Sequence, residues 1–65
     1  MPSSVIRAYH YEPARKRLQV VFINGRRYSY FAVPPDVYER FKQAASKGEF
    51  FNTAIRDHFP FAREG

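Results

Sequence analysis

The segment Gly25-Arg26-Arg27-Tyr28-Ser29-Tyr30-Phe31-Ala32-Val33-Pro34 decides the fold of this chain. Its residues alternate over Arg26 to Phe31 in the period-two pattern of a β-strand that has two different faces. Proline then ends the extended structure. We therefore predict a strand here with tyrosines on one face and cationic, small and aromatic groups on the other. The first face holds Tyr28 and Tyr30, and the second holds Arg27, Ser29 and Phe31.

Two more strands precede this segment, at Val5 to Tyr11 and Leu18 to Ile23. Both runs are rich in β-branched and aromatic residues and are bounded by turn-forming sequences. Glu12 to Lys16 contains a proline suited to the first turn, and Asn24-Gly25 is a strong hairpin signal for the second. Because the three strands are close in sequence, we predict an antiparallel meander.

The length of the second turn decides which side chains share a face. A two-residue loop at Asn24-Gly25 would place Val21 beside Tyr28, whereas a three-residue loop with Gly25 in the left-handed position would place Val20 there. We favour the three-residue loop because it separates core from solvent more cleanly. Its core face holds Leu18, Val20, Phe22, Tyr28 and Tyr30.

Two short helices are expected after these strands. Apolar residues recur at helical spacing from Pro35 to about Ala45. The sequence Ser46-Lys47-Gly48-Glu49 then matches the capping box that begins a helix, and Pro60 stops that helix. The alternative makes Gly48 the C-terminal cap of the first helix. The predicted fold class is α+β: a three-stranded antiparallel β-meander followed by two short helices packed on one sheet face.

The composition limits what the protein can be. A chain of 65 residues with seven Phe and five Tyr forms one aromatic core, so residues 1–65 are expected to be a single domain. With no cysteine and two histidines we predict no metal site and no other cofactor. No constellation of catalytic groups stands out, so we predict no enzymatic activity. No apolar run has the length of a signal peptide or a membrane span, and a cytoplasmic location is expected.

The charge balance points to an anionic partner. Eleven Lys and Arg oppose six Asp and Glu, which gives a formal net charge of +5. On the sheet face opposite the core, arginines beside exposed aromatic rings would hold phosphates and stack bases. Tyr9 and Arg7 join this face if Ile6 and Ala8 point inward. A solvated face, or one covered by the terminal segment, is the alternative. The candidate nucleic-acid-binding residues are Arg7, Tyr9, Arg17, Arg26, Arg27 and Phe31.

Two functional classes stay open. The first is a nucleic-acid-binding accessory module, with RNA as the preferred nucleic acid. The second is a protein-interaction module that uses the same exposed aromatic residues. A continuous positive stripe favours nucleic acid, whereas an aromatic patch with few arginines favours a protein partner. Neither class involves a membrane or a metal.

The ordered set of motifs resembles the KTSC domain family, named for its occurrence at the C-terminus of some lysyl-tRNA synthetases. The resemblance covers Ser3 to Phe61 and includes a central Tyr-x-Tyr motif. It implies a small α+β module in its stand-alone form, for which RNA binding has been suggested. The chain departs from the family at His10, where a small residue is usual. The motif residues that we class as structural are Tyr28, Tyr30, Ser46, Gly48 and Asn52. The alternatives are that the two tyrosines stack on bases and that the asparagine contacts a ligand.

Overall fold

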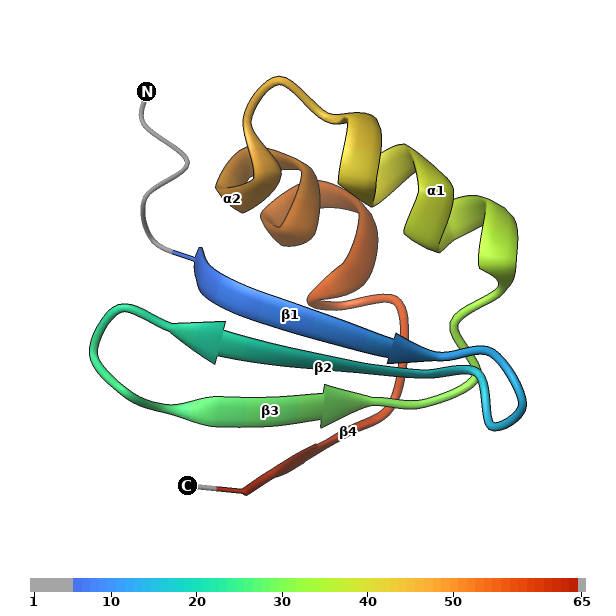
Figure 1. The fold of residues 1–65 in the computed structure, drawn as a ribbon, viewed down its shortest axis with the longest axis horizontal. Coiled ribbons are helices and arrows are strands. Elements are labelled where there is room, and N and C mark those ends of the chain that lie inside the picture. The colour runs from blue at the N-terminus through green and yellow to red at the C-terminus, as the bar shows by residue number, and fades with distance from the viewer. Residues whose placement is uncertain (1–5, 65) are drawn as a thin grey trace.

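A computed structural model describes residues 6–64 and shows an antiparallel sheet with helices on one face (Figure 1). The sheet has four strands in the order β1-β2-β3-β4. Two helices lie between β3 and β4 in sequence, and the second continues as one π-helical turn, η1. The α+β fold class is therefore confirmed. The elements are β1 (Ile6–Glu12), β2 (Arg17–Phe22), β3 (Arg27–Tyr30), α1 (Pro35–Gln43), α2 (Lys47–Phe50), η1 (Phe51–Ile55) and β4 (Phe61–Arg63).

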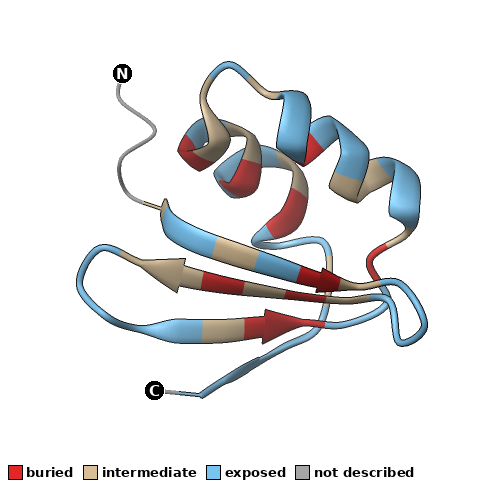
Figure 2. Cartoon of the chain, viewed as in Figure 1, coloured by how far each residue is buried: buried red, intermediate tan, exposed pale blue. Residues whose placement is uncertain are grey.

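The prediction of three strands is wrong by one, because the chain returns to the sheet after η1. Strand β4 pairs antiparallel with β3, with Ala62 opposite Ser29 and Phe61 opposite Tyr30. All residues of β4 are exposed, as its pale blue colour in Figure 2 shows. Without a buried side, β4 lacks the alternation that marks a strand in sequence. It forms on the backbone groups that the outer edge of β3 offers.

The turn between β2 and β3 has the predicted three-residue form. The Gly25 N–H donates a hydrogen bond to the Phe22 carbonyl over 2.9 Å. Gly25 has a φ of 88°, in the left-handed region that glycine adopts without steric cost. The register places Val20 opposite Tyr28. The predicted division of faces in these two strands is therefore confirmed.

The register of β1 differs from the prediction. Ile6 packs against the core as predicted, but the pairing shifts between Ile6 and Ala8, in the manner of a β-bulge around Arg7. An added residue moves every later side chain to the other face. Tyr9 consequently lies opposite Val20, on the core side of the sheet. The predicted placement of Tyr9 on the outer face, with Ala8 inward, is wrong.

The helices begin where the sequence predicts. Helix α1 starts at Pro35 and ends at Gln43, slightly before the predicted end. The Ser46 hydroxyl oxygen accepts a hydrogen bond from the Glu49 N–H over 3.3 Å, so the predicted cap of the second helix is confirmed. Gly48 lies inside α2 and does not end α1.

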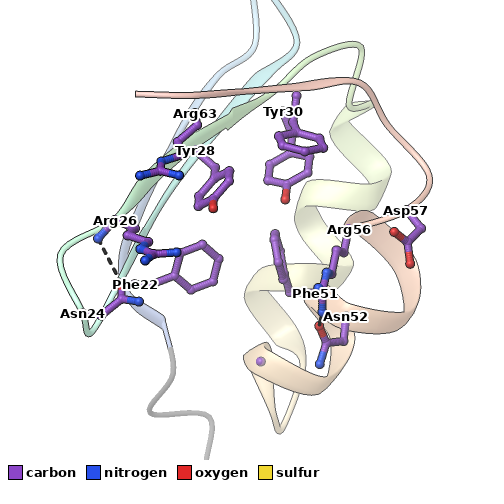
Figure 3. Close-up of a pocket in the computed structure, with 12 residues that line it drawn as sticks. Phe22, Asn24, Arg26, Tyr28, Tyr30, Phe51, Asn52, Arg56, Asp57 and Arg63 are labelled. Atoms are coloured by element: carbon purple, nitrogen blue, oxygen red, sulfur yellow. Dashed lines mark hydrogen bonds between the residues drawn. The ribbon is translucent and has the colours of Figure 1, made fainter. Parts of the chain in front are cut away.

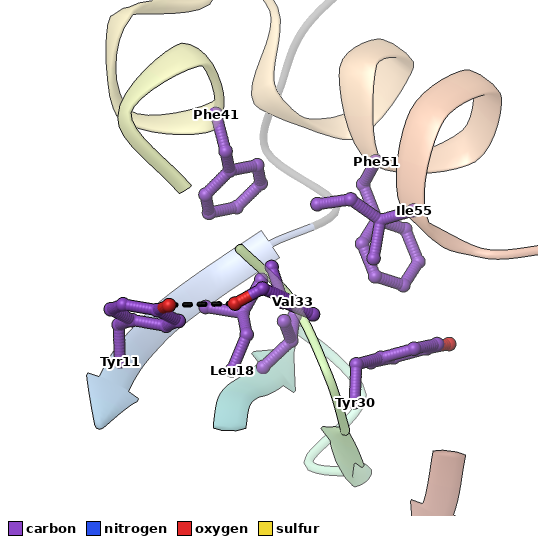
Figure 4. Close-up of a cluster of buried hydrophobic side chains, with 8 residues drawn as sticks. Tyr11, Leu18, Tyr30, Val33, Phe41, Phe51 and Ile55 are labelled. Carbon is purple, nitrogen blue, oxygen red and sulfur yellow. Dashed lines mark hydrogen bonds between the residues drawn. The ribbon is translucent and has the colours of Figure 1, made fainter. Parts of the chain in front are cut away.

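The hydrophobic core lies between the sheet and the helices (Figure 4). Leu18 from β2, Phe41 from α1 and Ile55 from η1 are each fully buried there. At the edge of this core the Tyr11 hydroxyl donates a hydrogen bond to the Val33 carbonyl over 2.6 Å. The predicted packing of the helices on one sheet face is confirmed, and it leaves the opposite face of the sheet without a helical cover (Figure 1).

Candidate functional site

A cleft of about 700 Å³ opens between the β2–β3 turn, β4 and the second helical segment (Figure 3). Aromatic rings form its apolar lining and contact one another. The ring centroids of Tyr30 and Phe61 are 5.3 Å apart, and those of Tyr28 and Phe61 are 5.7 Å apart. Phe61 is nevertheless 54% exposed, so a ligand can reach its ring. The aromatic lining residues are Phe22, Tyr28, Tyr30, Phe51 and Phe61.

The two tyrosines of the central motif belong both to the core and to the cleft. Tyr30 is 3% exposed and packs edge-on against Phe51, whereas Tyr28 is half-buried. Burial raises the pKa of the Tyr30 hydroxyl, and the nearby Tyr28 adds to this effect. Within residues 6–64 neither hydroxyl has a hydrogen-bond partner. Both hydroxyls point into the cleft (Figure 3).

The polar lining differs between the two sides of the cleft. Arg26 from the β2–β3 turn and Arg63 from β4 lie on one side, which we call the strand wall (Figure 3). Asn52, Arg56 and Asp57 lie on the other side, the helix wall. In the helix wall, the Arg56 Nη1 donates a hydrogen bond to the Asn52 Oδ1 over 3.2 Å.

The cleft carries a net positive charge. Among residues 6–64 its lining holds three arginines and one aspartate. Within the described part of the chain none of these arginines forms an ion pair. Their charges are thus available to a ligand, and clefts lined by one sign of charge attract ligands of the opposite sign.

The outer face of the sheet, where the sequence placed the binding residues, is occupied by the end of the chain. The Glu64 carboxylate accepts a hydrogen bond from Gln19 Nε2 and another from Ser29 Oγ, each 2.6 Å long. Ser29 is fully buried as a result. The Arg17 guanidinium lies 2.7 Å from the Glu12 carboxylate and 3.9 Å from that of Glu64. Arg17 is therefore already paired, and the positive face expected from the sequence is partly neutralised.

Glu64 also attaches β4 to the sheet. Its N–H donates a hydrogen bond to the Arg27 carbonyl over 2.7 Å, which extends the pairing of β3 with β4. The hydrogen bonds from Ser29 and then Gln19 hold the pKa of the Glu64 carboxyl below its usual range. The ionised carboxylate on the outer face thus fixes a strand that supplies part of the cleft on the other face.

The structure separates the predicted nucleic-acid-binding residues. Arg26 lines the cleft. Tyr9 packs edge-on against Phe41, with ring centroids 4.9 Å apart, inside the aromatic core. Arg7 and Arg27 are exposed but lie outside the cleft. Phe31, 37% exposed, follows the end of β3 and does not line the cleft either.

The motif residues classed as structural lie closer to the cleft than the predicted binding residues do. Tyr28, Tyr30, Gly48 and Asn52 all line it, while Ser46 caps α2. Sequence reasoning missed the remaining contributors. The available signal was the tail after Pro60, where an aromatic residue and an arginine stand two positions apart and so share one face of an extended strand. The lining residues that the sequence did not single out as site residues are Phe22, Asn24, Phe51, Arg56, Asp57, Phe61 and Arg63.

The described chain also bears on metal sites and membrane spans. Between residues 6 and 64, histidine and acidic side chains do not gather in groups of three or more that could hold a metal ion. None of the helices described here has the length and apolar character needed to cross a membrane. The cleft is therefore the candidate functional site of the described chain.

Comparison with known sequences identifies the family. The sequence model of the KTSC domain matches residues 2–59. The chain belongs to the KTSC domain family. The crystal structure of a KTSC domain protein from Yersinia pestis superposes on it with a TM-score of 0.89 and 33% sequence identity, covering 100% of this chain and 92% of that one.

KTSC relatives of this chain occur in two settings. A lysine–tRNA ligase of Nostoc punctiforme is 43% identical over 58 residues, which are 89% of this chain and 10% of the ligase. A protein of Tsukamurella paurometabola is 39% identical over 57 residues, which are 88% of this chain and 85% of that protein. The chain therefore spans about 10% of the length of the ligase it matches and most of the small relative.

Proposed function

We propose that this KTSC domain is a non-enzymatic accessory module that binds single-stranded RNA in the cleft between β4 and the second helical segment. One observation carries the proposal: three arginines that form no ion pair within residues 6–64 surround a cleft lined by aromatic rings. Proteins that bind single strands combine these two elements, because cationic groups hold the phosphates while aromatic rings stack on the bases.

The comparisons support RNA as the nucleic acid. A similar domain forms part of a protein named lysine–tRNA ligase, whose name includes an RNA substrate. The net charge of +5 is also that of a domain that meets polyanions. A cytoplasmic location, where RNA and a cysteine-free chain are both expected, belongs to the same proposal.

The cleft is a better site than the outer sheet face, for an electrostatic reason. On the outer face, a phosphate that approached Arg17 would meet the carboxylates of Glu12 and Glu64. Among the described residues that line the cleft, Asp57 is the single acid, and it shares the lining with three arginines. A phosphate in the cleft therefore displaces no ion pair of the described chain.

Two exposed phenylalanines offer a matched test. Phe61 lines the cleft and is 54% exposed, whereas Phe31 is 37% exposed and lies outside it. Phe61→Ala should weaken binding of a fluorescently labelled single-stranded RNA by about 1 to 3 kcal/mol, the contribution of one base stacked on an aromatic ring. Phe31→Ala should leave the affinity unchanged. Fluorescence polarisation at low salt measures both affinities, and circular dichroism verifies that each variant is folded.

The opposite outcomes are equally informative. A loss of affinity with Phe31→Ala but not with Phe61→Ala would move the site to the outer side of the sheet. If the wild-type domain does not bind the RNA even at low salt, RNA is excluded as the ligand and the protein-interaction module is favoured. The same purified proteins and the same probe therefore distinguish all three results.

A further inference from the structure

We infer that the cleft recognises the identity of one unstacked base, with the RNA backbone along the strand wall and the edge of the base against the helix wall. This inference rests on the proposed RNA binding and adds to it an orientation and a base preference. It follows from the unequal distribution of charge and hydrogen-bonding groups across the cleft.

The strand wall suits a phosphate. Its charged groups, Arg26 and Arg63, are both cationic, and both side chains are exposed. The side-chain oxygen of Asn24 accepts a hydrogen bond from the Arg26 N–H over 3.0 Å, so this oxygen is directed to the backbone of the turn. A guanidinium binds a phosphate through two parallel hydrogen bonds, which fixes the direction of the backbone as well as its position.

The helix wall suits the edge of a base. Arg56 and Asp57 leave the helix wall without net charge, and the Asp57 carboxylate accepts hydrogen bonds from an amino group. The side-chain oxygen of Asn52 is already engaged by Arg56, so its amino group remains available as a donor. The Tyr30 hydroxyl points into the same space without a partner among residues 6–64, and its raised pKa keeps it protonated. Together these lining groups offer donors and one strong acceptor.

The ligand must be an unpaired base. In a double helix the bases are stacked and their edges are paired, whereas single strands let a base turn out onto an aromatic side chain. The exposed ring of Phe61, on β4 two residues before Arg63, lines the cleft and provides that platform. A cleft of about 700 Å³ has the size usual for sites that enclose a small ligand.

The acceptor in the helix wall selects a base that carries an amino group. Cytosine and uracil have the same size, but cytosine presents an amino donor where uracil presents a carbonyl oxygen. Opposite Asp57, the amino group makes a charge-assisted hydrogen bond, whereas the carbonyl oxygen is repelled. We therefore expect the domain to prefer cytosine to uracil.

The test compares labelled oligo(C) with oligo(U) at neutral pH by fluorescence polarisation. The wild-type domain should bind oligo(C) about tenfold more tightly, the size of one good base contact. Asp57→Ala should bring this ratio close to one. Glu39→Ala is the matched control: Glu39 is also an exposed acid, it pairs with Lys42 on α1, and its removal changes the net charge equally. The control should preserve the ratio.

A second variant tests the helix wall without changing its charge. Tyr30→Phe keeps the buried ring and removes only the hydroxyl, so the domain should stay folded. It should weaken binding of oligo(C) by about three- to tenfold, the usual contribution of one hydrogen bond. Full affinity of Tyr30→Phe would remove this hydroxyl from the site and overturn its assigned role.

Two results separate this inference from the proposed function. Equal binding of oligo(C) and oligo(U) by the wild-type domain, or a ratio unaffected by Asp57→Ala, overturns base recognition while RNA binding stands. No binding of either oligonucleotide overturns the proposed function itself.

Discussion

Replacing Arg63 with glutamine should lower the salt dependence of RNA binding by a defined amount. Each phosphate of a single strand that is neutralised by the protein contributes a slope of about −0.7 to the plot of log affinity against log salt concentration. The strand wall holds two cations, Arg26 and Arg63. Contacts from both give a wild-type slope of about −1.4, and Arg63→Gln should reduce it to about −0.7.

These slopes differ enough to measure. A fourfold rise in salt should weaken the wild-type domain by about sevenfold and the Arg63→Gln variant by about threefold. Arg63 is exposed and forms no ion pair within residues 6–64, so the substitution should change the free energy of unfolding by no more than about 0.5 kcal/mol. Fluorescence polarisation over a salt series gives the slope, and a thermal melt gives the stability.

Two matched variants show whether the effect belongs to the cleft. Arg40→Gln removes the same charge from an exposed position on α1, and Arg27→Gln removes it from the outer face of the sheet. Both should keep the wild-type slope. Phosphate contact by Arg63 is refuted if Arg27→Gln lowers the slope and Arg63→Gln does not. It is also refuted if all three variants lower it equally, because the attraction would then be a property of the net charge alone.

Three further predictions concern the fold that supports the cleft. Ile55→Ala should cost about 2 to 5 kcal/mol of unfolding free energy, because Ile55 is fully buried, while Ile23→Ala, at a position 61% exposed, should cost no more than about 0.5 kcal/mol in the same thermal melts. Gly25→Ala should cost about 1 kcal/mol in chemical denaturation, from the positive φ alone, since an added Cβ meets nothing within 4 Å; a neutral result would contradict the left-handed turn. Because folding lowers the pKa of the Glu64 carboxyl, the carboxylate's stabilisation of β4 should be complete at neutral pH and be lost as the pH falls through that lowered pKa. Glu64→Gln should abolish this acid transition in the amide resonance of Ser29, and its persistence in the variant would assign the transition to another group.

The parts of the fold predicted from sequence are those with strong local signals. The Asn24-Gly25 turn needs a residue with positive φ, and Gly25 provides it, so the register of β2 with β3 follows. The start of the second helix follows in the same way from the hydroxyl of Ser46, which can cap it. In both places local chemistry and tertiary packing favour the same conformation.

The errors arise where the structure depends on contacts distant in sequence. The shift around Arg7 has no residue signature, yet it moves Tyr9 from the expected outer face into the core. Strand β4 forms because the edge of β3 accepts it, and the two-position spacing of Phe61 and Arg63 is its only signal in these three residues. The cleft needs Phe61 and Arg63 from that strand. The tyrosines of the cleft could therefore be singled out from sequence, whereas the contribution of β4 to the cleft could not.

Nuclear magnetic resonance titration of the isotope-labelled domain with a short single-stranded RNA shows directly whether RNA binds in the cleft. Its signals report on the cleft and on the outer side of the sheet in the same experiment, without any substitution. The account predicts that the largest shifts occur at the cleft, at Arg26, Asn52 and Phe61, while the amides of Gln19 and Arg27 on the outer side change little. Largest shifts at Gln19 and Arg27, with the cleft resonances unmoved, would contradict it.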